Sequence, residues 1–223
     1  MKIDIQIPES LSEVTLYQYQ RFDKLVKENK PSDFVNQKTI EIFCKLELKD
    51  VARIKLVDVS EILVHLNKIL NQKPQFKQTF KLGKYEFGFI PNLEEITSGE
   101  FIDCEEYLKD TDTLHKAMAV LFRPITKKYK DYYDIEPYET AEKYSEVLKY
   151  MPLDIALGTM VFFYDLMNDS LKGLKDYILN QAEQSEAIQK HLVKSGVGIN
   201  QFTQQLEEIF SNLTALQHYQ SKN

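Results

Sequence analysis

Cysteine, glycine and proline are scarce in this chain of 223 residues, and tryptophan is absent. The two cysteines, Cys44 and Cys104, cannot build a disulfide framework, so the reducing interior of a cell is the expected compartment. Seven glycines and seven prolines are typical of a helix-rich fold, because long helices accommodate few of either. Without tryptophan, we expect the 13 tyrosines and 13 phenylalanines to supply the bulky side chains of the core.

An excess of basic residues and a long apolar run are also missing. The formal net charge is -6, from 28 basic and 34 acidic residues, which argues against a protein that mainly wraps nucleic acid. The N-terminal residues MKIDIQIPESL alternate apolar with polar residues and lack the apolar run of a secretory signal. No stretch reaches the about 20 apolar residues of a membrane-spanning helix. We therefore expect an acidic, soluble protein with no membrane partner.

Sequence motifs for metal, nucleotide or nucleophilic chemistry are absent as well. The histidines are scattered, without a partner at metal-ligand spacing: His65, His115, His191 and His218. There is no GxGxxG, no P-loop lysine and no GxSxG elbow. The sequence therefore predicts no cofactor, no metal ligand and no catalytic residue.

Cys104 and His115 come nearest to a nucleophile with its base. A thiol becomes a good nucleophile only when a base or a positive charge lies close to it. Cys104 shares a helix face with Phe101 and Leu108, and on such a face a thiol behaves as a small apolar side chain. A cysteine-based enzyme is therefore kept as a minor alternative to a non-enzymatic protein.

The most apolar stretch, MPLDIALGTMVFFYDLM at residues 151–167, predicts a buried helix. Pro152 suits a first helical turn, because its missing N–H would be unpaired there in any case. Apolar residues then cover almost the whole circumference, whereas a surface helix keeps a polar face. We expect this central helix, about 152–167, to organise the fold.

Other helices and one hairpin are expected around the central helix. Apolar stripes of helical spacing run over residues 16–26, 35–46, 59–70, 101–108 and 114–121, and Thr15 with Gln18 has capping-box form. Two alternating runs flank Gly83 and Lys84, which predicts a β-hairpin over about 76–90. Residues 2–7 alternate too, and predict an N-terminal strand that can join the hairpin. The predicted fold class is mainly α, a multi-helix bundle with this small β-element.

A glycine-containing hinge, SGVG at residues 195–198, divides the predicted domains. Residues 1–195 are expected to form a single helical domain with the β-element, and residues 196–223 a C-terminal amphipathic helix. Apolar residues at alternating spacings of three and four give this helix a coiled-coil seam: Ile199, Phe202, Leu206, Ile209, Leu213 and Leu216. The seam can dock on its own domain, meet a second copy or bind another protein, and the sequence leaves these options open.

Residues 125–138 are polar and aromatic, without clear periodicity. The run KKYKDYY at 127–133 interleaves lysines with tyrosines, a pattern that can stack on single-stranded nucleic acid. Nearby acidic residues dilute the charge, and tyrosine is frequent at protein-interface hot spots. We therefore expect a protein-contact loop, with single-strand binding as a minor alternative. The expected partner-binding residues lie here and in the C-terminal seam: Tyr129, Tyr132, Tyr133, Phe202, Leu206, Ile209 and Leu213.

Four stretches together resemble one group of proteins: TLYQYQRF (15–22), GFIPNLEEITSGEFIDCEEYL (88–108), HKAMAVLFRPI (115–125) and MPLDIALGTMVFFYDL (151–166). They are similar to tailed-bacteriophage proteins encoded among virion and tail morphogenesis genes, some structural and some tail-assembly-chaperone-like. The similarity extends over most of the chain up to Leu166, with an echo in SGVGINQF (195–202). None of these stretches is a motif with a known chemical role.

The resemblance implies a non-enzymatic phage morphogenesis protein that acts through protein–protein contacts, as a tail assembly chaperone. The alternative is a structural component of the virion, in the tail or the head–tail region. The implied partners are other phage structural or tail proteins, and the C-terminal helix adds the option of a homo-oligomer. A chaperone would act in the host cytoplasm during assembly, whereas a structural component would be found in the virion.

Overall fold

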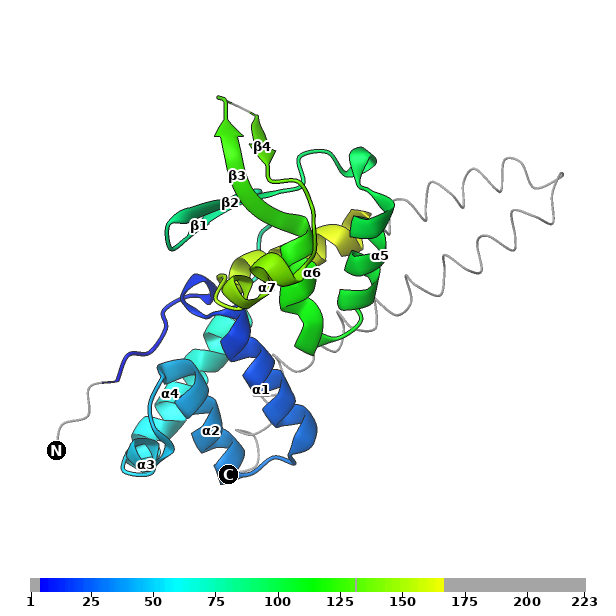
Figure 1. Ribbon diagram of the computed structural model, residues 1–223. Coiled ribbons are helices and arrows are strands. Elements are labelled where there is room, and N and C mark those ends of the chain that lie inside the picture. The colour runs from blue at the N-terminus through cyan, green and yellow to red at the C-terminus, as the bar shows by residue number, and fades with distance from the viewer. Residues whose placement is uncertain (1–4, 131, 167–223) are drawn as a thin grey trace, which may run out of the picture.

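Helices form the N-terminal part of the molecule in the computed structural model, which describes residues 5–130 and 132–166 (Figure 1). A short 3-10 turn (Leu11–Glu13) is followed by α1 (Leu16–Glu28), α2 (Asp33–Cys44), α3 (Leu48–Val51) and α4 (Leu56–Leu70). Their apolar stripes meet in one core, where Tyr19, Phe22 and Leu66 are fully buried. Thr15 and Gln18 form the predicted capping box at the start of α1.

A four-stranded antiparallel sheet follows, in the order β1-β2-β3-β4. Its strands are β1 (Thr79–Leu82), β2 (Tyr85–Phe89), β3 (Phe122–Lys128) and β4 (Tyr133–Ile135). β1 and β2 are the predicted hairpin, and Gly83 between them has a φ of 58°, the left-handed conformation that glycine adopts without strain. The predicted class, a mainly α bundle with one small hairpin, is wrong. The fold is mixed α and β, because residues 122–135 add two more strands.

Pro124 lies inside β3. From the sequence alone, this proline indicates only the end of the preceding apolar run. Pro124 is opposite Phe87 of β2, and its carbonyl accepts a hydrogen bond from the backbone N–H of Glu136 at 2.9 Å. The N–H and the carbonyl of one residue in an antiparallel strand point to the same side. An N–H group at this position would therefore point toward the residues after β4 and away from β2. The proline thus removes no backbone hydrogen bond between β3 and β2.

Three more helices and the central helix pack around the sheet. They are α5 (Ser98–Tyr107), α6 (Leu114–Leu121) and α7 (Glu142–Leu148), with short 3-10 turns at Leu93–Glu95 and Thr111–Thr113. Residues 153–166 are helical, and Leu153, Ala156 and Met160 in this stretch are fully buried. Further along, the ring of Phe162 meets the ring of Phe89 in β2, with 5.8 Å between the centroids. This stretch is a buried helix at its start, as its composition predicts, and it then supports the sheet.

Backbone hydrogen bonds join the first helix to the start of the central helix. The N–H of Leu16 donates to the carbonyl of Met151 at 3.0 Å, and the N–H of Leu153 donates to the carbonyl of Val14 at 2.8 Å. These bonds hold the beginning of α1 against the beginning of the 153–166 helix. The N-terminal helices and the sheet with its helices therefore share one continuous core.

Two further sequence predictions differ from the structure. Phe101 does not face the core and is 57% exposed, because Glu100 and Cys104 form the buried side of α5. Of the predicted N-terminal strand, residues 5–7 are not in a strand, and residues 2–4 lie outside the described part of the chain. Ile5 and Ile7 pack on the core without strand pairing, and β3 takes the place next to β2.

Gly158 lets the central helix approach the chain just before the sheet. A Cβ atom at this position would overlap the carbonyl of Gln75, at 2.6 Å from its carbon, and lie 3.0 Å from the backbone nitrogen of Phe76. We expect Gly158→Ala to lower the free energy of unfolding by about 1–3 kcal/mol, because backbone atoms must move apart. Gly99→Ala is the matched control in α5, since nothing lies within 4 Å of its added Cβ. Urea denaturation followed by circular dichroism compares them, and equal stabilities would contradict the prediction.

Candidate protein-contact site

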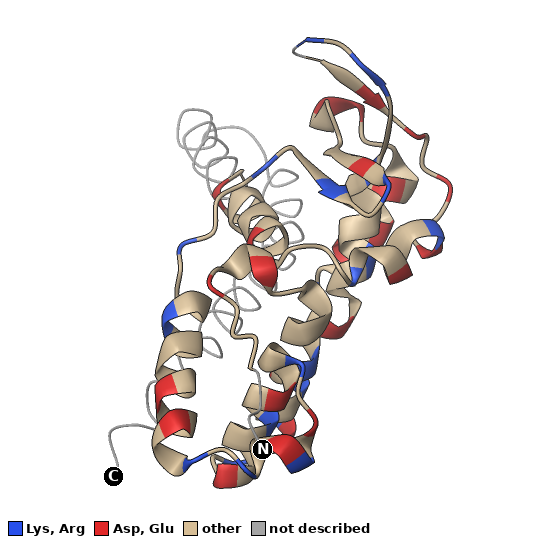
Figure 2. Cartoon of the chain, turned by 90° about the vertical axis from the view of Figure 1, so that its left-hand side faces the viewer, with Lys and Arg blue, Asp and Glu red and all other residues tan. Residues whose placement is uncertain are grey.

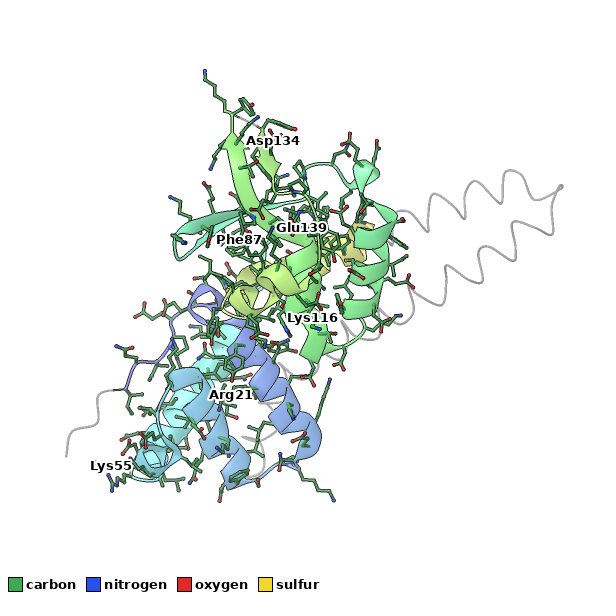
Figure 3. All side chains as sticks on the ribbon, in the orientation of Figure 1. Arg21, Lys55, Phe87, Lys116, Asp134 and Glu139 are labelled. Carbon is green, nitrogen blue, oxygen red and sulfur yellow. The ribbon has the colours of Figure 1, made fainter. Side chains whose placement is uncertain are left out.

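Beyond Ile125, β3 and β4 leave the body of the molecule as a two-stranded projection, here called the arm (residues 125–135; Figure 1). The pairing register shifts between Ile125 and Lys127, which leaves Thr126 as a bulge. A bulge bends its strand and increases the local twist. The arm therefore changes direction at its base, and Figure 3 shows Asp134 on it, far from Arg21 and Lys55 of the N-terminal helices.

The tip of the arm exposes two tyrosines side by side. The backbone N–H of Tyr129 donates to the carbonyl of Tyr132 at 2.7 Å and closes the turn. The two ring centroids are 5.8 Å apart, and Tyr129 and Tyr132 are 55% and 56% exposed. The pKa of Tyr132 is raised, mainly by a hydrogen bond with Asp134. Such a pair offers an apolar surface with polar ends, which suits a protein contact.

Tyr133, the third tyrosine of the predicted contact loop, holds the base of the arm. Its hydroxyl donates to the carbonyl of Phe89 at 2.9 Å. Its ring lies over Gly88 of β2, where an added Cβ would come within 2.9 Å of the ring and 3.0 Å of Ile125. Burial is the main cause that raises the pKa of this tyrosine. The structure therefore places Tyr133 behind the exposed pair, as its support.

Lysines surround the tyrosine pair at the tip. Figure 2 shows blue basic residues gathered at the end of the arm. Lys128 pairs with Glu86 of β2 at 2.5 Å, which draws its charge toward the sheet. Lys127 and Lys130 have no ion pair within the described part of the chain. These two positive charges are available to a partner.

A buried ion pair holds the start of β3. The guanidinium of Arg123 donates to the carboxylate of Glu100 in α5, and both side chains are almost completely buried. It also donates to the carbonyl of Val120 at 3.2 Å, and the ring of Tyr138 lies 5.6 Å from its central carbon. The hydroxyl of Tyr138 donates in turn to Asp103. These contacts fix β3 against α5 and so set the direction of the arm.

Cys104 and His115 are both buried. Burial raises the pKa of Cys104 to about 12, so this thiol is protonated at neutral pH and is a poor nucleophile. Burial is also the main cause that lowers the pKa of His115. The Nδ1 atom of His115 lies 3.0 Å from the side-chain nitrogen of Gln20, which also donates to the carbonyl of Thr111. Among the described contacts, none joins the thiol to the imidazole.

The remaining predicted contact residues belong to the C-terminal seam. Phe202, Leu206, Ile209 and Leu213 lie outside the described residues, as do the hinge at 195–198 and the predicted domain boundary. Of the predicted contact residues in the described part, Tyr129 and Tyr132 are exposed at the tip of the arm and Tyr133 lies behind them. Sequence reasoning did not single out Gly88. The absent side chain at residue 88 admits the Tyr133 ring, and only the pairing of β3 with both β2 and β4 reveals this.

Residues 5–130 and 132–166 contain neither a cluster of metal-ligating side chains nor a membrane-spanning helix. Within these ranges, no group of three or more His, Cys, Asp and Glu side chains could hold a metal ion. Over the same ranges, no helix is both long and apolar enough to cross a membrane. Comparison of the chain with protein-family models, curated proteins and solved structures finds no match.

Proposed function

We propose that this chain is a non-enzymatic protein of tailed-phage morphogenesis that acts through protein–protein contacts, as a tail assembly chaperone. The observation that carries the proposal is the exposed pair of Tyr129 and Tyr132 at the end of a projecting arm. The resemblance of four sequence stretches to phage morphogenesis proteins supplies the biological setting. The protonated, buried thiol of Cys104 counts against the cysteine-based alternative.

A chaperone that holds a partner needs exposed apolar surface of its own, because the partner offers apolar segments. The described surface has such groups beyond the arm. Leu56, Val57 and Val64 lie on one side of α4 and are at least half exposed. This surface adds to the support for a holding role.

Co-expression with the proteins encoded next to this chain tests the proposal. We expect a tagged chain to retain a neighbouring tail protein, above all a very long helical one, and to increase its solubility. Replacing Tyr129 and Tyr132 together by serine should reduce the retained partner about tenfold or more, because hot-spot residues carry most of the binding energy. The amount of partner in the eluate is measured on a denaturing gel.

A second exposed tyrosine pair provides the control. Tyr17 and Tyr150 have ring centroids 6.0 Å apart on another part of the surface. Their double serine variant should retain the partner like wild type. Failure of the wild-type chain to retain or solubilise any neighbour would refute the chaperone role. Mass spectrometry of mature particles then tests the alternative, since a virion component is present there at a fixed copy number and a chaperone is not.

A further inference from the structure

The outer face of α5 presents apolar residues beside carboxylates. Phe101 and Ile102 are 57% and 62% exposed. Glu105 lies one helical turn after Phe101, and Glu106 lies one helical turn after Ile102. A capping box between Thr97 and Glu100 fixes the start of this helix. The four exposed residues, Phe101, Ile102, Glu105 and Glu106, are called the α5 face below.

The surroundings of the α5 face are strongly acidic. Residues 93–110 contain seven acidic residues and one lysine. Glu100 forms a buried ion pair with Arg123, whereas Glu106 is exposed and forms only a surface pair with Lys109 at 2.9 Å. Glu105 has no ion pair within the described part of the chain. The face therefore offers two apolar side chains inside a field of negative charge, and it suits an aromatic partner that brings positive charge.

The tip of the arm has the opposite character. Residues 126–132 contain three lysines and one aspartate around the pair of Tyr129 and Tyr132. Both surfaces combine exposed apolar side chains with charge, and the charges have opposite sign. In Figure 1 the arm rises at the top of the molecule, whereas α5 lies at the right of the body. Glu95, just before α5, is among the charges that raise the pKa of Tyr132, but no described hydrogen bond, ion pair or ring contact joins the tip to the α5 face itself. Among residues 5–130 and 132–166, both surfaces are thus exposed and make no direct contact with each other.

We propose that the tip of the arm of one copy binds the α5 face of a second copy. Tyr129 and Tyr132 would cover Phe101 and Ile102, while Lys127 and Lys130 meet the carboxylates of Glu105 and Glu106. The contact joins two different surfaces, and each copy carries both of them. It therefore either closes reciprocally between two copies or repeats from copy to copy into a ring or a filament. The inference rests on the proposed function in one respect, that the arm is a protein-contact site.

Sedimentation velocity of the full-length chain alone tests the contact. The contact is small, so we expect weak association, with the mean mass rising between about 10 µM and 1 mM. Raising the salt from about 0.05 M to about 0.5 M should weaken it, because the Debye length shortens. A monomer throughout this range at low salt would overturn the inference.

Charge reversal locates the contact. The arm variant K127E/K130E should associate at least about tenfold more weakly than wild type, because like charges then face each other. The control K30E/K73E changes the net charge equally at two exposed lysines of other segments, and it should associate like wild type. Equal effects of the two variants would contradict a contact at the arm.

Mixing complementary variants gives the decisive result. The face variant E105K/E106K should also fail to associate alone. Mixed with the arm variant it should associate again, because the acidic arm fits the basic face and the two unchanged surfaces fit each other. A mixture that stays monomeric contradicts the pairing of these two surfaces. The variant I102S tests the apolar part of the contact. Ile102 is exposed, so its replacement should weaken association and leave the circular dichroism spectrum and the melting temperature unchanged.

The two proposals fail in distinguishable ways. A chain that stays monomeric yet retains a tail protein in co-expression overturns the self-contact and leaves the proposed function standing. A chain that associates through the arm but retains no neighbour supports the self-contact and counts against the chaperone role.

Discussion

Replacement of Arg123 by methionine is expected to lower the free energy of unfolding by about 3–5 kcal/mol. Arg123 donates to Glu100, and both side chains are almost completely buried. Removing one partner of a buried ion pair leaves the other charge without compensation in a medium of low dielectric. The methionine also loses the contact with the ring of Tyr138 and the hydrogen bond to Val120. Urea denaturation followed by circular dichroism measures the loss.

Two matched variants show whether the uncompensated charge of Glu100 causes the loss of stability in Arg123→Met. The double variant Glu100→Gln with Arg123→Met should be more stable than Arg123→Met alone, because glutamine leaves no buried charge and can still cap Thr97. Arg53→Met removes an exposed arginine that lies 3.5 Å from Asp50, and should cost less than about 1 kcal/mol. If Arg123→Met is as stable as Arg53→Met, the ion pair is not a structural support of β3.

The ion pair of Glu100 and Arg123 also makes the free energy of unfolding depend on pH. Burial by itself would raise the pKa of Glu100, but hydrogen bonds from Thr97 and Arg123 outweigh it and the pKa lies below its ordinary value of 4.5. A carboxyl group with a lowered pKa stabilises the fold above pH 4.5, and this contribution is lost as the pH falls through the folded-state pKa. The double variant lacks this carboxyl group. Its free energy of unfolding should therefore decrease less than that of wild type between about pH 6 and pH 3.

The helices of the N-terminal part could be predicted because their signals are local. Leu16, Tyr19 and Phe22 recur at helical spacing, and all three are buried in the core. The capping box of Thr15 and Gln18 needs only residues three positions apart. The hairpin of β1 and β2 was equally readable, because Gly83 marks a turn between two alternating runs.

The second half of the sheet was missed because α6 passes into β3 without a break. Leu121 ends the helix and Phe122 begins the strand, so no glycine or polar turn separates them. Pro124 added a misleading signal, since proline is rare in strands that have neighbours on both sides. It is tolerated because its missing donor faces the residues after β4, a fact of pairing that no local pattern records.

The candidate site was predictable in composition and not in arrangement. The interleaved lysines and tyrosines of residues 127–133 pointed to a contact loop. Which tyrosines are exposed depends on a strand that is not adjacent to theirs in the sheet, because Gly88 of β2 admits the ring of Tyr133 from β4. Tyr129 and Tyr132 stay exposed at the tip. The exposure of Phe101 was hidden for a similar reason. Glu100 lies on the buried side of α5 because it pairs with Arg123 of β3. Helical periodicity does not indicate this, since Arg123 is distant in the sequence.

Leu157→Asp is expected to abolish the folded state, the largest effect among the predicted substitutions. Leu157 is 1% exposed in the middle of the central helix, where an ionised carboxylate would lose its hydration without gaining a partner. Leu56→Asp is the matched control, because Leu56 is 78% exposed at the start of α4 and its change should alter stability by less than about 0.5 kcal/mol. Near-ultraviolet circular dichroism and thermal melting compare the two. A cooperative transition of Leu157→Asp near that of wild type would mean that the 153–166 helix does not organise the core, whereas loss of the transition would place this helix at the centre of the fold.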